Sequence, residues 1–459
     1  MRFHLALWSA KTVNWLVKKI APGRGSNIAG AVALKIDPNF VSKFKFDPDK
    51  ILYVTGTNGK SSTTNLIVHL AQNAGLKIIS NIEGANMLPG VANSLLRDCS
   101  LTGKLEADFL VMETDERSLP LIHNALPTNN LLVTNLQKDQ VGRNGDPAFI
   151  YRKIKQVVTP NTTLFLNNEE PRSASLQFLP HRQQYFFSVE KNARSFNKDP
   201  QLPTMPCPLT HSEIEFSYMN VDNVGPFSNR DGSYKSKSES EVDDRISSIN
   251  FDNRTFNYEG LEFHIPYNVS PMLYNYVAAL SIAKHLFKID LKVCQAAFLA
   301  FQNIDGRFVE FSYRHKKIRY LRIKQENPDT LQNVLNVIAD ENEEASLVLH
   351  KLQTVVDFNP FYLNNFFCFD CDIERLKTGK LQRIVDAGSS HQADSINSII
   401  LWLKAVDWPA DKMASAKTTS SKDLLDLISQ QPGDVVYLIT YLGEYEAMRD
   451  LIEKEETYA

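Results

Sequence analysis

Residues 51–62 read Ile51-Leu52-Tyr53-Val54-Thr55-Gly56-Thr57-Asn58-Gly59-Lys60-Ser61-Ser62. The apolar half predicts a buried strand, and the Gly-Lys-Ser run predicts a phosphate-binding loop that opens a helix. Glycines let backbone N–H groups close around phosphate oxygens, Lys60 reaches the transferred phosphoryl group, and the Ser61 hydroxyl can hold Mg²⁺. Val54 replaces the first glycine of the common pattern, so the assignment depends on the flanking strand and helix. Lys60 is expected at the loop tip, outside the core.

The sequence after the loop completes a strand–helix–strand unit. Leu66, Leu70 and Ala71 recur at helical spacing, and Gly75 supplies a C-terminal cap. Residues 77–80 then predict the next strand. We therefore expect an α/β fold in which a parallel sheet carries the phosphate loop.

Acidic and amide side chains follow two further predicted strands. Residues 109–112 end in the run Glu113 to Glu116, and residues 131–134 end in Asn135, with Asp139 and Gln140 just beyond. Open α/β sheets bind ligands at the carboxyl edge of their strands, and a phosphate loop needs an acidic partner for its metal. One such cluster alone would be read as solvated acids; two in order after the loop predict a nucleotide–Mg²⁺ site.

Composition limits the class of protein and its compartment. The 459 residues suffice for about three domains, and 43% of them are hydrophobic. Lys and Arg number 50 against 53 Asp and Glu, so the net charge of −3 argues against nucleic acid as a partner. Five irregularly spaced cysteines favour a reducing compartment, and we find neither a signal-peptide pattern nor an apolar run of about 18 residues. We expect a cytoplasmic protein.

The first twenty residues predict an amphipathic helix. Leu5, Trp8, Trp15 and Leu16 recur at near-helical spacing among lysines. Such a basic helix can rest on an anionic membrane, but a stripe of this kind more often packs on its own domain, and we favour packing.

The phosphate loop resembles that of the Mur ligases and folylpolyglutamate synthases, which activate a carboxylate as an acyl phosphate and pass it to an amine. More narrowly, the chain resembles the MurT family, the Mur-ligase-like subunits of lipid II isoglutaminyl synthase. The matching stretches are Gly23-Arg24-Gly25-Ser26 to Gly30, the loop itself, Gly84-Ala85-Asn86-Met87 with Gly90, Glu113-Thr114-Asp115-Glu116, Asn135 to Gln140, Leu166-Asn167, Tyr274-Asn275, Gly306-Arg307, Lys324 with Asn327-Pro328, and Thr440-Tyr441.

The resemblance implies three parts: an N-terminal helical segment (1–45), a central Mur-ligase ATPase domain with a parallel sheet (46–305) and a C-terminal Rossmann-like domain (306–459). It also implies a reaction: ATP-dependent amidation of the D-glutamate α-carboxyl in the lipid II stem peptide, giving D-isoglutamine. Ammonia would come from a separate GatD-type glutaminase subunit.

The resemblance further implies roles for individual residues. Lys60 would stabilise the phosphoryl group, and Ser61 and Glu113 would hold Mg²⁺. ATP would be bound by the loop and by residues of later motifs, namely Gly56, Thr57, Asn58, Gly59, Asn135, Asn275, Arg307 and Lys324. Lys324 would approach when the C-terminal domain closes.

The chain departs from the family at the zinc ribbon. The family carries four cysteines there, but the two knuckles read Cys207-Pro208-Leu209-Thr210 and Ser228-Asn229-Arg230-Asp231. One thiolate cannot hold a structural zinc, so we expect no zinc. The degenerate insertion is placed at about 200–256, and the Ser-rich, charged stretch 233–248 is expected to be a flexible loop.

The C-terminal domain departs as well. The family supplies an aspartate to the partner's Cys–His pair, and alignment on Phe369 to Asp372 puts Asn364 at that position, with Asp357 as the substitute if the register differs. Cys368 and Cys371 are interpreted as buried structural thiols and His391 as a structural histidine.

Two other functions stay open. The chain could be another Mur-type or folylpolyglutamate-type amide ligase that uses an amino acid instead of ammonia, or a scaffolding subunit of low activity. The scaffold reading is suggested by Asn364 and by Val269 and Met272, which stand where the family has a glycine and an asparagine.

Overall fold

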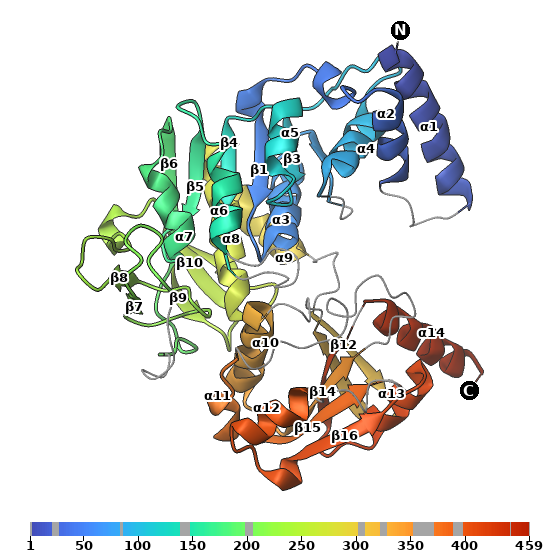
Figure 1. The fold of residues 1–459 in the computed structure, drawn as a ribbon, viewed down its shortest axis with the longest axis vertical. Helices are drawn as coiled ribbons and strands as arrows, with labels where there is room; N and C mark the ends of the chain where they lie inside the picture. The colour runs from blue at the N-terminus through green and yellow to red at the C-terminus, as the bar shows by residue number, and fades with distance from the viewer. Residues whose placement is uncertain are drawn as a thin grey trace. The chain divides into compact units, whose positions relative to one another are not determined.

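The computed structural model describes residues 2–20, 27–82, 86–137, 147–197, 205–301, 308–321, 328–351, 371–388, 398–440 and 442–458. These residues form two compact units, one ending at residue 301 and one beginning at residue 308 (Figure 1). Both units combine helices with mostly parallel sheets, which confirms the α/β class expected from the sequence. Among the described residues, no helix is long and apolar enough to span a membrane.

The first unit is built on a nine-stranded sheet. In spatial order its strands are β11 (Leu261–His264), β10 (Thr255–Tyr258), β9 (Asp244–Asn250), β6 (Gln183–Val189), β5 (Thr163–Asn167), β4 (Asn130–Val133), β1 (Ile51–Thr55), β3 (Phe109–Glu113) and β2 (Ile78–Ser80). Neighbours from β2 to β9 pair in parallel, whereas β9, β10 and β11 form an antiparallel meander. The strands predicted at 51–54, 77–80, 109–112 and 131–134 are all present.

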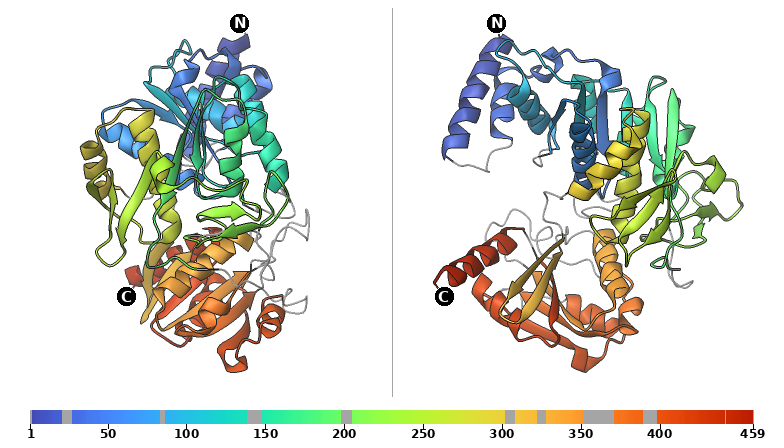
Figure 2. Two further views of the ribbon diagram at one scale, coloured as in Figure 1. Left: turned by 90° about the vertical axis from the view of Figure 1, so that its left-hand side faces the viewer. Right: turned by 180° about the vertical axis from the view of Figure 1, so that it is seen from behind.

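Helices cover both faces of this sheet (Figures 1 and 2). Their bounds are α1 (Arg2–Ile20), α2 (Ile28–Ile36), α3 (Lys60–Asn73), α4 (Leu88–Asp98), α5 (Leu119–Ala125), α6 (Pro147–Lys155), α7 (Pro171–Ala174), α8 (Ser270–His285) and α9 (Leu291–Ala300). Helices α5 and α6 lie on one face, and α3, α8 and α9 pack together on the other.

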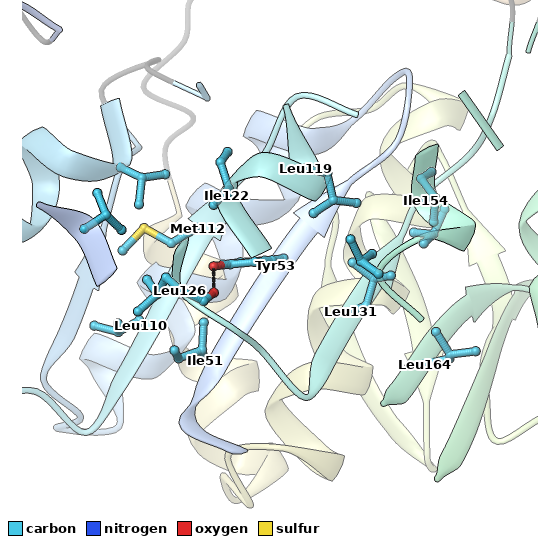
Figure 3. Packing of buried hydrophobic residues seen from close by; sticks show 14 of the residues in the cluster. Ile51, Tyr53, Leu110, Met112, Leu119, Ile122, Leu126, Leu131, Ile154 and Leu164 are labelled. Atoms are coloured by element: carbon cyan, nitrogen blue, oxygen red, sulfur yellow. Dashed lines mark hydrogen bonds between the residues drawn. The ribbon is translucent and has the colours of Figure 1, made fainter. Parts of the chain in front are cut away.

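The core beneath α5 and α6 follows from the period of two along the strands. Ile51 and Tyr53 of β1 point to this face with Leu110 and Met112 of β3, and all four are fully buried (Figure 3). The Tyr53 hydroxyl donates a hydrogen bond to the carbonyl oxygen of Leu126, so the buried phenol is satisfied. Both faces of β1 are buried, which fixes the direction in which the strand delivers the loop after Thr55.

The second unit contains a six-stranded sheet of order β12 (Phe308–Tyr313), β13 (Lys316–Leu321), β17 (Val435–Ile439), β14 (Ala345–Lys351), β15 (Leu381–Gly388) and β16 (Met413–Lys417). Among the described strands of this sheet, β12 and β13 form the one antiparallel pair. One face carries α10 (Pro328–Glu341), α11 (Glu374–Lys377) and α12 (Ser398–Ala405), and the other carries α13 (Ser421–Ser429) and α14 (Leu442–Tyr458). This is the layered arrangement of a Rossmann-like domain.

The expectation of a flexible loop at 233–248 is wrong. Lys237 N donates to Asn168 Oδ1 at 2.9 Å, a capping box closes on Ser238, and β9 then runs between β6 and β10. Asp244 in β9 is buried and accepts a hydrogen bond from the Tyr258 hydroxyl at 2.6 Å. Residues 244–248 of the Ser-rich segment therefore belong to the sheet, and the inserted hairpin of β7 (Ile214–Phe216) and β8 (Phe227–Asn229) lies before the segment.

The favoured packing of the N-terminal stripe is also wrong, although the helix itself is present. Helix α1 packs on α2 and α4 through Ala6, Leu7 and Ala10, which are fully buried. Leu5, Trp8, Trp15 and Leu16 lie on the opposite side and are 42–60% exposed. Ala6 and Ala10 are small enough to let α1 and α2 approach closely, with Leu7 filling the core between the helices, which explains why this face is the buried one.

Candidate nucleotide-binding site

Strand β1 ends at the sheet's carboxyl edge, and the next four residues turn the chain into α3. Gly56 and Gly59 have φ values of +128° and +82°, which side-chain-bearing residues rarely adopt. Gly59 is the N-cap of α3, so the first free N–H groups of that helix open onto the loop. This is the geometry of a phosphate-binding loop, as the sequence predicts.

The loop is held in place from the end of β4. Thr57 N donates to the Asn135 carbonyl oxygen at 2.8 Å, and Asn58 N donates to Asn135 Oδ1 at 2.9 Å. The Thr134 hydroxyl donates to the Asn58 carbonyl oxygen at 2.7 Å, and Gln137 N donates to the Thr57 hydroxyl at 3.0 Å. Asn135, expected to line the nucleotide, therefore also braces the loop that would bind it.

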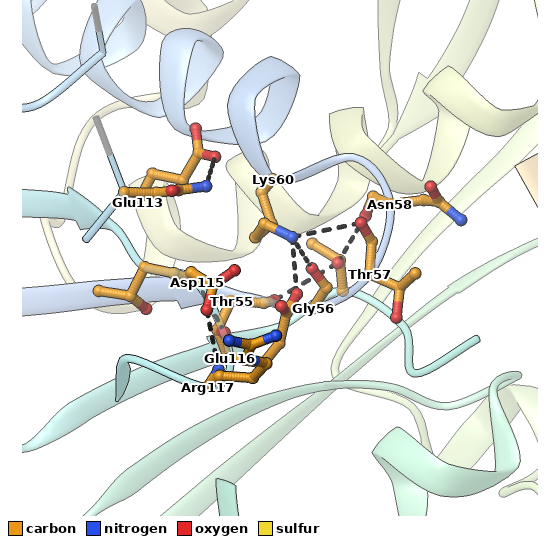
Figure 4. Close-up of polar contacts among 12 residues, drawn as sticks. Thr55, Gly56, Thr57, Asn58, Lys60, Glu113, Asp115, Glu116 and Arg117 are labelled. Carbon is orange, nitrogen blue, oxygen red and sulfur yellow. Dashed lines mark hydrogen bonds and ion pairs between the residues drawn. The ribbon is translucent and has the colours of Figure 1, made fainter. Parts of the chain in front are cut away.

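Lys60 is buried and not exposed at a loop tip, which corrects the expectation from the sequence. Its Nζ donates to Glu116 Oε1 at 2.6 Å, to the Thr57 carbonyl oxygen at 3.2 Å and to the Gly56 carbonyl oxygen (Figure 4). Glu116 is 2% exposed; burial raises its pKa, and the Lys60 ammonium opposes that rise. The lysine is thus preorganised by a buried ion pair whose acidic member was not assigned a role from the sequence.

Glu113 closes β3 beside the loop, where it pairs in register with Val54 of β1. Asn81 holds its backbone through two hydrogen bonds of 2.8 Å, and Asn86 Nδ2 donates to Glu113 Oε1 at 3.2 Å. Ser61 stands in the first turn of α3. A carboxylate and a hydroxyl are ligands that suit Mg²⁺, so the donor set at this edge fits the metal expected from the sequence.

Helix α8 brings Asn275 to the loop. A Cβ built on Gly59 would overlap Asn275 Oδ1, so the amide lies directly against the loop backbone. Asn275 Nδ2 also contacts Met272 Sδ at 3.2 Å, and Val269 caps the helix without a side-chain hydrogen bond. Within the first unit the fold therefore gathers the loop, Glu113, Asn135 and Asn275 from four separate stretches of sequence.

Sequence analysis did not identify one buried carboxyl group, that of Glu169, which contacts the residue before Asn275. Glu169 Oε2 accepts hydrogen bonds from the Tyr274 hydroxyl at 2.5 Å and from Val189 N at 3.2 Å, and Asn220 Nδ2 lies 3.3 Å from the same hydroxyl. Burial raises the pKa of Glu169 to about 7 despite these hydrogen bonds. The group thus fixes Tyr274, the residue before Asn275.

We predict that Glu169 makes stability fall with rising pH. Between about pH 4.5 and 7 the folded state keeps a proton that the unfolded state releases, so stability drops by up to about 1.4 kcal/mol for each pH unit. Glu169→Gln should flatten this dependence, because glutamine stays neutral and can still accept from Tyr274. Urea unfolding at several pH values measures the slope, and Glu262→Gln, which removes an exposed carboxylate, is the control. An unchanged slope in Glu169→Gln would contradict the assignment.

The two stretches compared with zinc knuckles, 207–210 and 228–231, meet in the insertion. Asn229 Nδ2 donates to Ser233 Oγ at 3.0 Å and to Thr210 Oγ1 at 3.4 Å, Tyr234 N donates to Asn229 Oδ1 at 2.9 Å, and Thr210 N approaches Cys207 Sγ at 3.5 Å. Of these hydrogen bonds, the one from the Asn229 amide to the Thr210 hydroxyl joins the two turns, and the others stabilise a single turn each. Among the described residues, no group of three or more His, Cys, Asp or Glu side chains could hold a metal.

We predict that the purified protein contains no stoichiometric zinc, because only Cys207 remains of the four thiolates such a ribbon requires. A chelator should leave the melting temperature unchanged in the absence of nucleotide, since no folding free energy is coupled to zinc. Elemental analysis and a thermal melt with and without chelator measure this. About one zinc per chain would show that the second knuckle is misplaced.

Several residues singled out from the sequence lie outside the described residues. They are Gly23, Arg24, Gly25, Ser26, Gly84, Ala85, Asp139, Gln140, Gly306, Arg307, Lys324, Asn327, Asp357, Asn364, Cys368, Phe369, His391 and Tyr441. Cys371 is described and is buried, as expected of a structural thiol.

A sequence profile of the Mur ligase middle domain matches residues 54–283, which span the phosphate loop, β3, β4 and most of α8. The chain belongs to the Mur ligase family. Members of this family are ATP-dependent amide ligases that use Mg²⁺, and the loop, Glu113 and Asn275 all lie inside the matched region.

Within the Mur ligase family, the chain is similar to one group of curated proteins. The chain is 26% identical, over 98% of both chains, to the lipid II isoglutaminyl synthase (glutamine-hydrolyzing) subunit MurT of Streptococcus pneumoniae. It is 23% identical to MurT of Staphylococcus aureus over 83% of this chain and 85% of that one. This chain is therefore a divergent relative of MurT.

Solved structures show the same fold. A pseudomurein peptide ligase type C from Methanothermus fervidus superposes with a TM-score of 0.64 at 16% identity, covering 91% of this chain and 81% of that one. MurF from Acinetobacter baumannii superposes with a TM-score of 0.60 at 14% identity, covering 92% and 80%. The likeness extends beyond the matched middle domain, since nearly the whole chain is covered.

Proposed function

We propose that this chain is the ligase subunit of a lipid II isoglutaminyl synthase. It would use ATP to amidate the D-glutamate α-carboxyl of the lipid II stem peptide, with ammonia from a GatD-type glutaminase subunit in a cytoplasmic heterodimer. The observation that carries the proposal is the full-length similarity to MurT together with an intact phosphate loop. The donor set at Glu113 and Ser61 supports the use of Mg²⁺, which would neutralise charge on the phosphates.

The proposed chemistry has two balanced steps. A carboxylate oxygen attacks the γ-phosphorus of ATP, ADP leaves, and an acyl phosphate forms; ammonia then attacks the acyl carbon and phosphate departs. Lys60 would stabilise the phosphoryl group in the first step, because its ammonium already lies at the loop between Thr57 and Glu116. Asn135 and Asn275 would position the nucleotide, and the resemblance to MurT extends this role to Arg307 and Lys324.

Asn364 is proposed to complete the partner's Cys–His pair, with Asp357 as the alternative. A neutral amide can orient the partner's histidine but supplies no charge to favour the imidazolium, so glutamine hydrolysis should be slower than with aspartate. We predict that Asn364→Asp raises glutaminase activity of the reconstituted pair and that Asp357→Asn changes it little. Loss of hydrolysis in Asp357→Asn, with no effect of Asn364→Asp, would reverse the two roles.

The test of the whole proposal is reconstitution with a glutaminase subunit. Purified lipid II, ATP and glutamine should give amidated lipid II only when both subunits are present, and ADP should form in equal amount. Ligation of an amino acid without any glutaminase would favour the other ligase function. Binding of a glutaminase without ATP turnover would favour a scaffold.

A further inference from the structure

Helix α1 has two apolar faces, of which only one is covered. Leu7 and Ala10 are fully buried against the first unit, whereas Leu5, Trp8 and Trp15 are 60%, 60% and 56% exposed. At about 100° of rotation per residue, the three exposed side chains lie opposite the buried pair. A one-faced surface helix would carry polar residues there. The outer face of α1, defined as Leu5, Trp8, Trp15 and Leu16, thus needs its own explanation.

A neighbouring turn extends the outer face. The Trp8 indole N–H donates to the Leu101 carbonyl oxygen at 3.1 Å, and the Leu101 side chain is itself 72% exposed. The patch therefore combines two tryptophans and three leucines from two segments, held in a fixed relation by a hydrogen bond. A group of large exposed apolar side chains on one side of a helix marks an interaction site in a folded protein.

The charge on α1 is of one sign. Residues 2–20 contain Arg2, Lys11, Lys18 and Lys19 and no Asp or Glu. Lys19 Nζ lies 4.1 Å from the centre of the Trp15 ring, which places an ammonium within the patch itself. Two acidic groups that flank Leu101 in the sequence are paired with cations, Asp98 with Arg97 at 2.8 Å and Glu106 with Lys104 at 3.3 Å.

The buried side of α1 fixes the helix in the unit. Lys11 Nζ donates to the carbonyl oxygens of Leu96 at 2.9 Å and Cys99 at 2.8 Å, at the end of α4. The Arg2 guanidinium donates to the carbonyl oxygen of Ile36 at 2.6 Å. The outer face is therefore presented by a docked helix and does not depend on folding at a surface.

We infer that the outer face of α1 rests on an anionic lipid bilayer, with the helix parallel to the membrane plane. Indole rings with one polar edge suit the headgroup boundary, leucines suit the acyl chains beneath it, and the Lys19 ammonium beside Trp15 suits anionic headgroups. A second copy of this chain fits less well, because two such faces would bring only cations together. The inference stands on α1 alone and goes beyond the proposed reaction, to which it would add access to a lipid-linked substrate.

The first test is vesicle binding by the full-length protein without nucleotide or substrate. Vesicles of phosphatidylcholine with phosphatidylglycerol should sediment the protein, vesicles of phosphatidylcholine alone should bind at least tenfold less, and added salt should release it. Trp8→Ser/Trp15→Ser should lower binding tenfold or more. Leu209→Ser/Leu299→Ser, which removes two exposed leucines elsewhere in the unit, should bind like the wild type.

The second test uses the four tryptophans as reporters. Trp402 and Trp408 are buried in the second unit, so a blue shift on vesicle addition should come from Trp8 and Trp15. Trp8→Phe/Trp15→Phe should lose most of the shift yet retain sedimentation, because phenylalanine keeps the apolar surface.

The third test reverses the charge of single lysines in the vesicle-binding assay. Lys19→Glu should weaken binding to anionic vesicles severalfold, whereas Lys422→Glu on α13, in the second unit, should not. Failure of the wild type to bind anionic vesicles, or equal binding by Trp8→Ser/Trp15→Ser, would overturn the inference. Loss of glutaminase binding in that double variant, with no vesicle binding by the wild type, would assign the outer face to a protein partner instead. Because no substrate is present, each of these outcomes leaves the ligase proposal standing.

Discussion

Lys60→Ala is expected to lower ATP-dependent ligation by roughly 100- to 1,000-fold, the usual effect of removing one preorganised charge from a phosphoryl-transfer site. The loss should appear mainly in kcat, because the ammonium stabilises charge that develops on the transferred group. ADP release at saturating ATP and substrate measures the effect. Turnover at the wild-type rate would exclude residues 55–61 as the phosphate site.

Because Lys60 pairs with the buried Glu116, a double variant can separate the effect on stability from the effect on activity. Removing the ammonium leaves the Glu116 carboxyl buried without this ion pair, and breaking a buried pair costs roughly 3–5 kcal/mol unless the carboxyl takes up a proton. Lys60→Ala/Glu116→Gln should therefore regain much of the stability that Lys60→Ala loses, without regaining activity. If both variants melt alike and both are inactive, the pair contributes little to folding and the kinetic conclusion is unaffected.

Local pattern was sufficient to predict the strand, the glycine loop and the helix that follows it, because these parts are adjacent in the chain. An apolar run, two glycines and a helical repeat follow one another within residues 51–75, and each part constrains its neighbours. Glu113 and Asn135 were also placed correctly at the sheet edge, since the carboxyl ends of parallel strands must meet there. The partner of Lys60 was not predicted, because nothing in the run from Glu113 to Glu116 shows which of its acids faces Lys60.

The incorrect predictions for residues 233–248 and for the outer face of α1 have the same physical cause: both segments contact residues that are far away in the sequence. From the sequence, Asp244 and Ser247 are typical of a loop. In the structure their strand, β9, pairs with β10, and Lys284 and His285 of α8 lie 3.2 and 3.1 Å from the Asp244 carboxylate. From its hydrophobicity, the outer face of α1 is expected to pack in the core. In the structure the opposite side, which carries the alanines, packs against α2. Hydrophobicity alone does not choose between two apolar faces; the close approach of the backbones does.

We predict that substituting alanine for each glycine of the phosphate-binding loop has a different effect on stability and ATP binding. Gly75, which lies outside the loop, is the reference. Gly75 has φ +81° and nothing within 4 Å of an added Cβ, so Gly75→Ala should cost only the left-handed backbone strain, about 1–2 kcal/mol. Gly59 has nearly the same φ, +82°, but its Cβ would displace the Asn275 amide. Gly59→Ala should therefore match Gly75→Ala in stability and differ from it by a raised KM for ATP.

Gly56→Ala should be the most damaging of the three. Its φ of +128° is disfavoured for any residue with a Cβ, and the added atom would overlap the Thr134 hydroxyl and lie 2.8 Å from the Asn135 carbonyl oxygen, which is backbone and cannot rotate away. We expect a loss of roughly 3–5 kcal/mol in the free energy of unfolding, together with loss of ATP binding. Urea unfolding and nucleotide titration of the three variants measure both quantities. A cost for Gly56→Ala no greater than for Gly75→Ala would contradict the close contact between the loop and the end of β4, and with it the bracing role of Asn135.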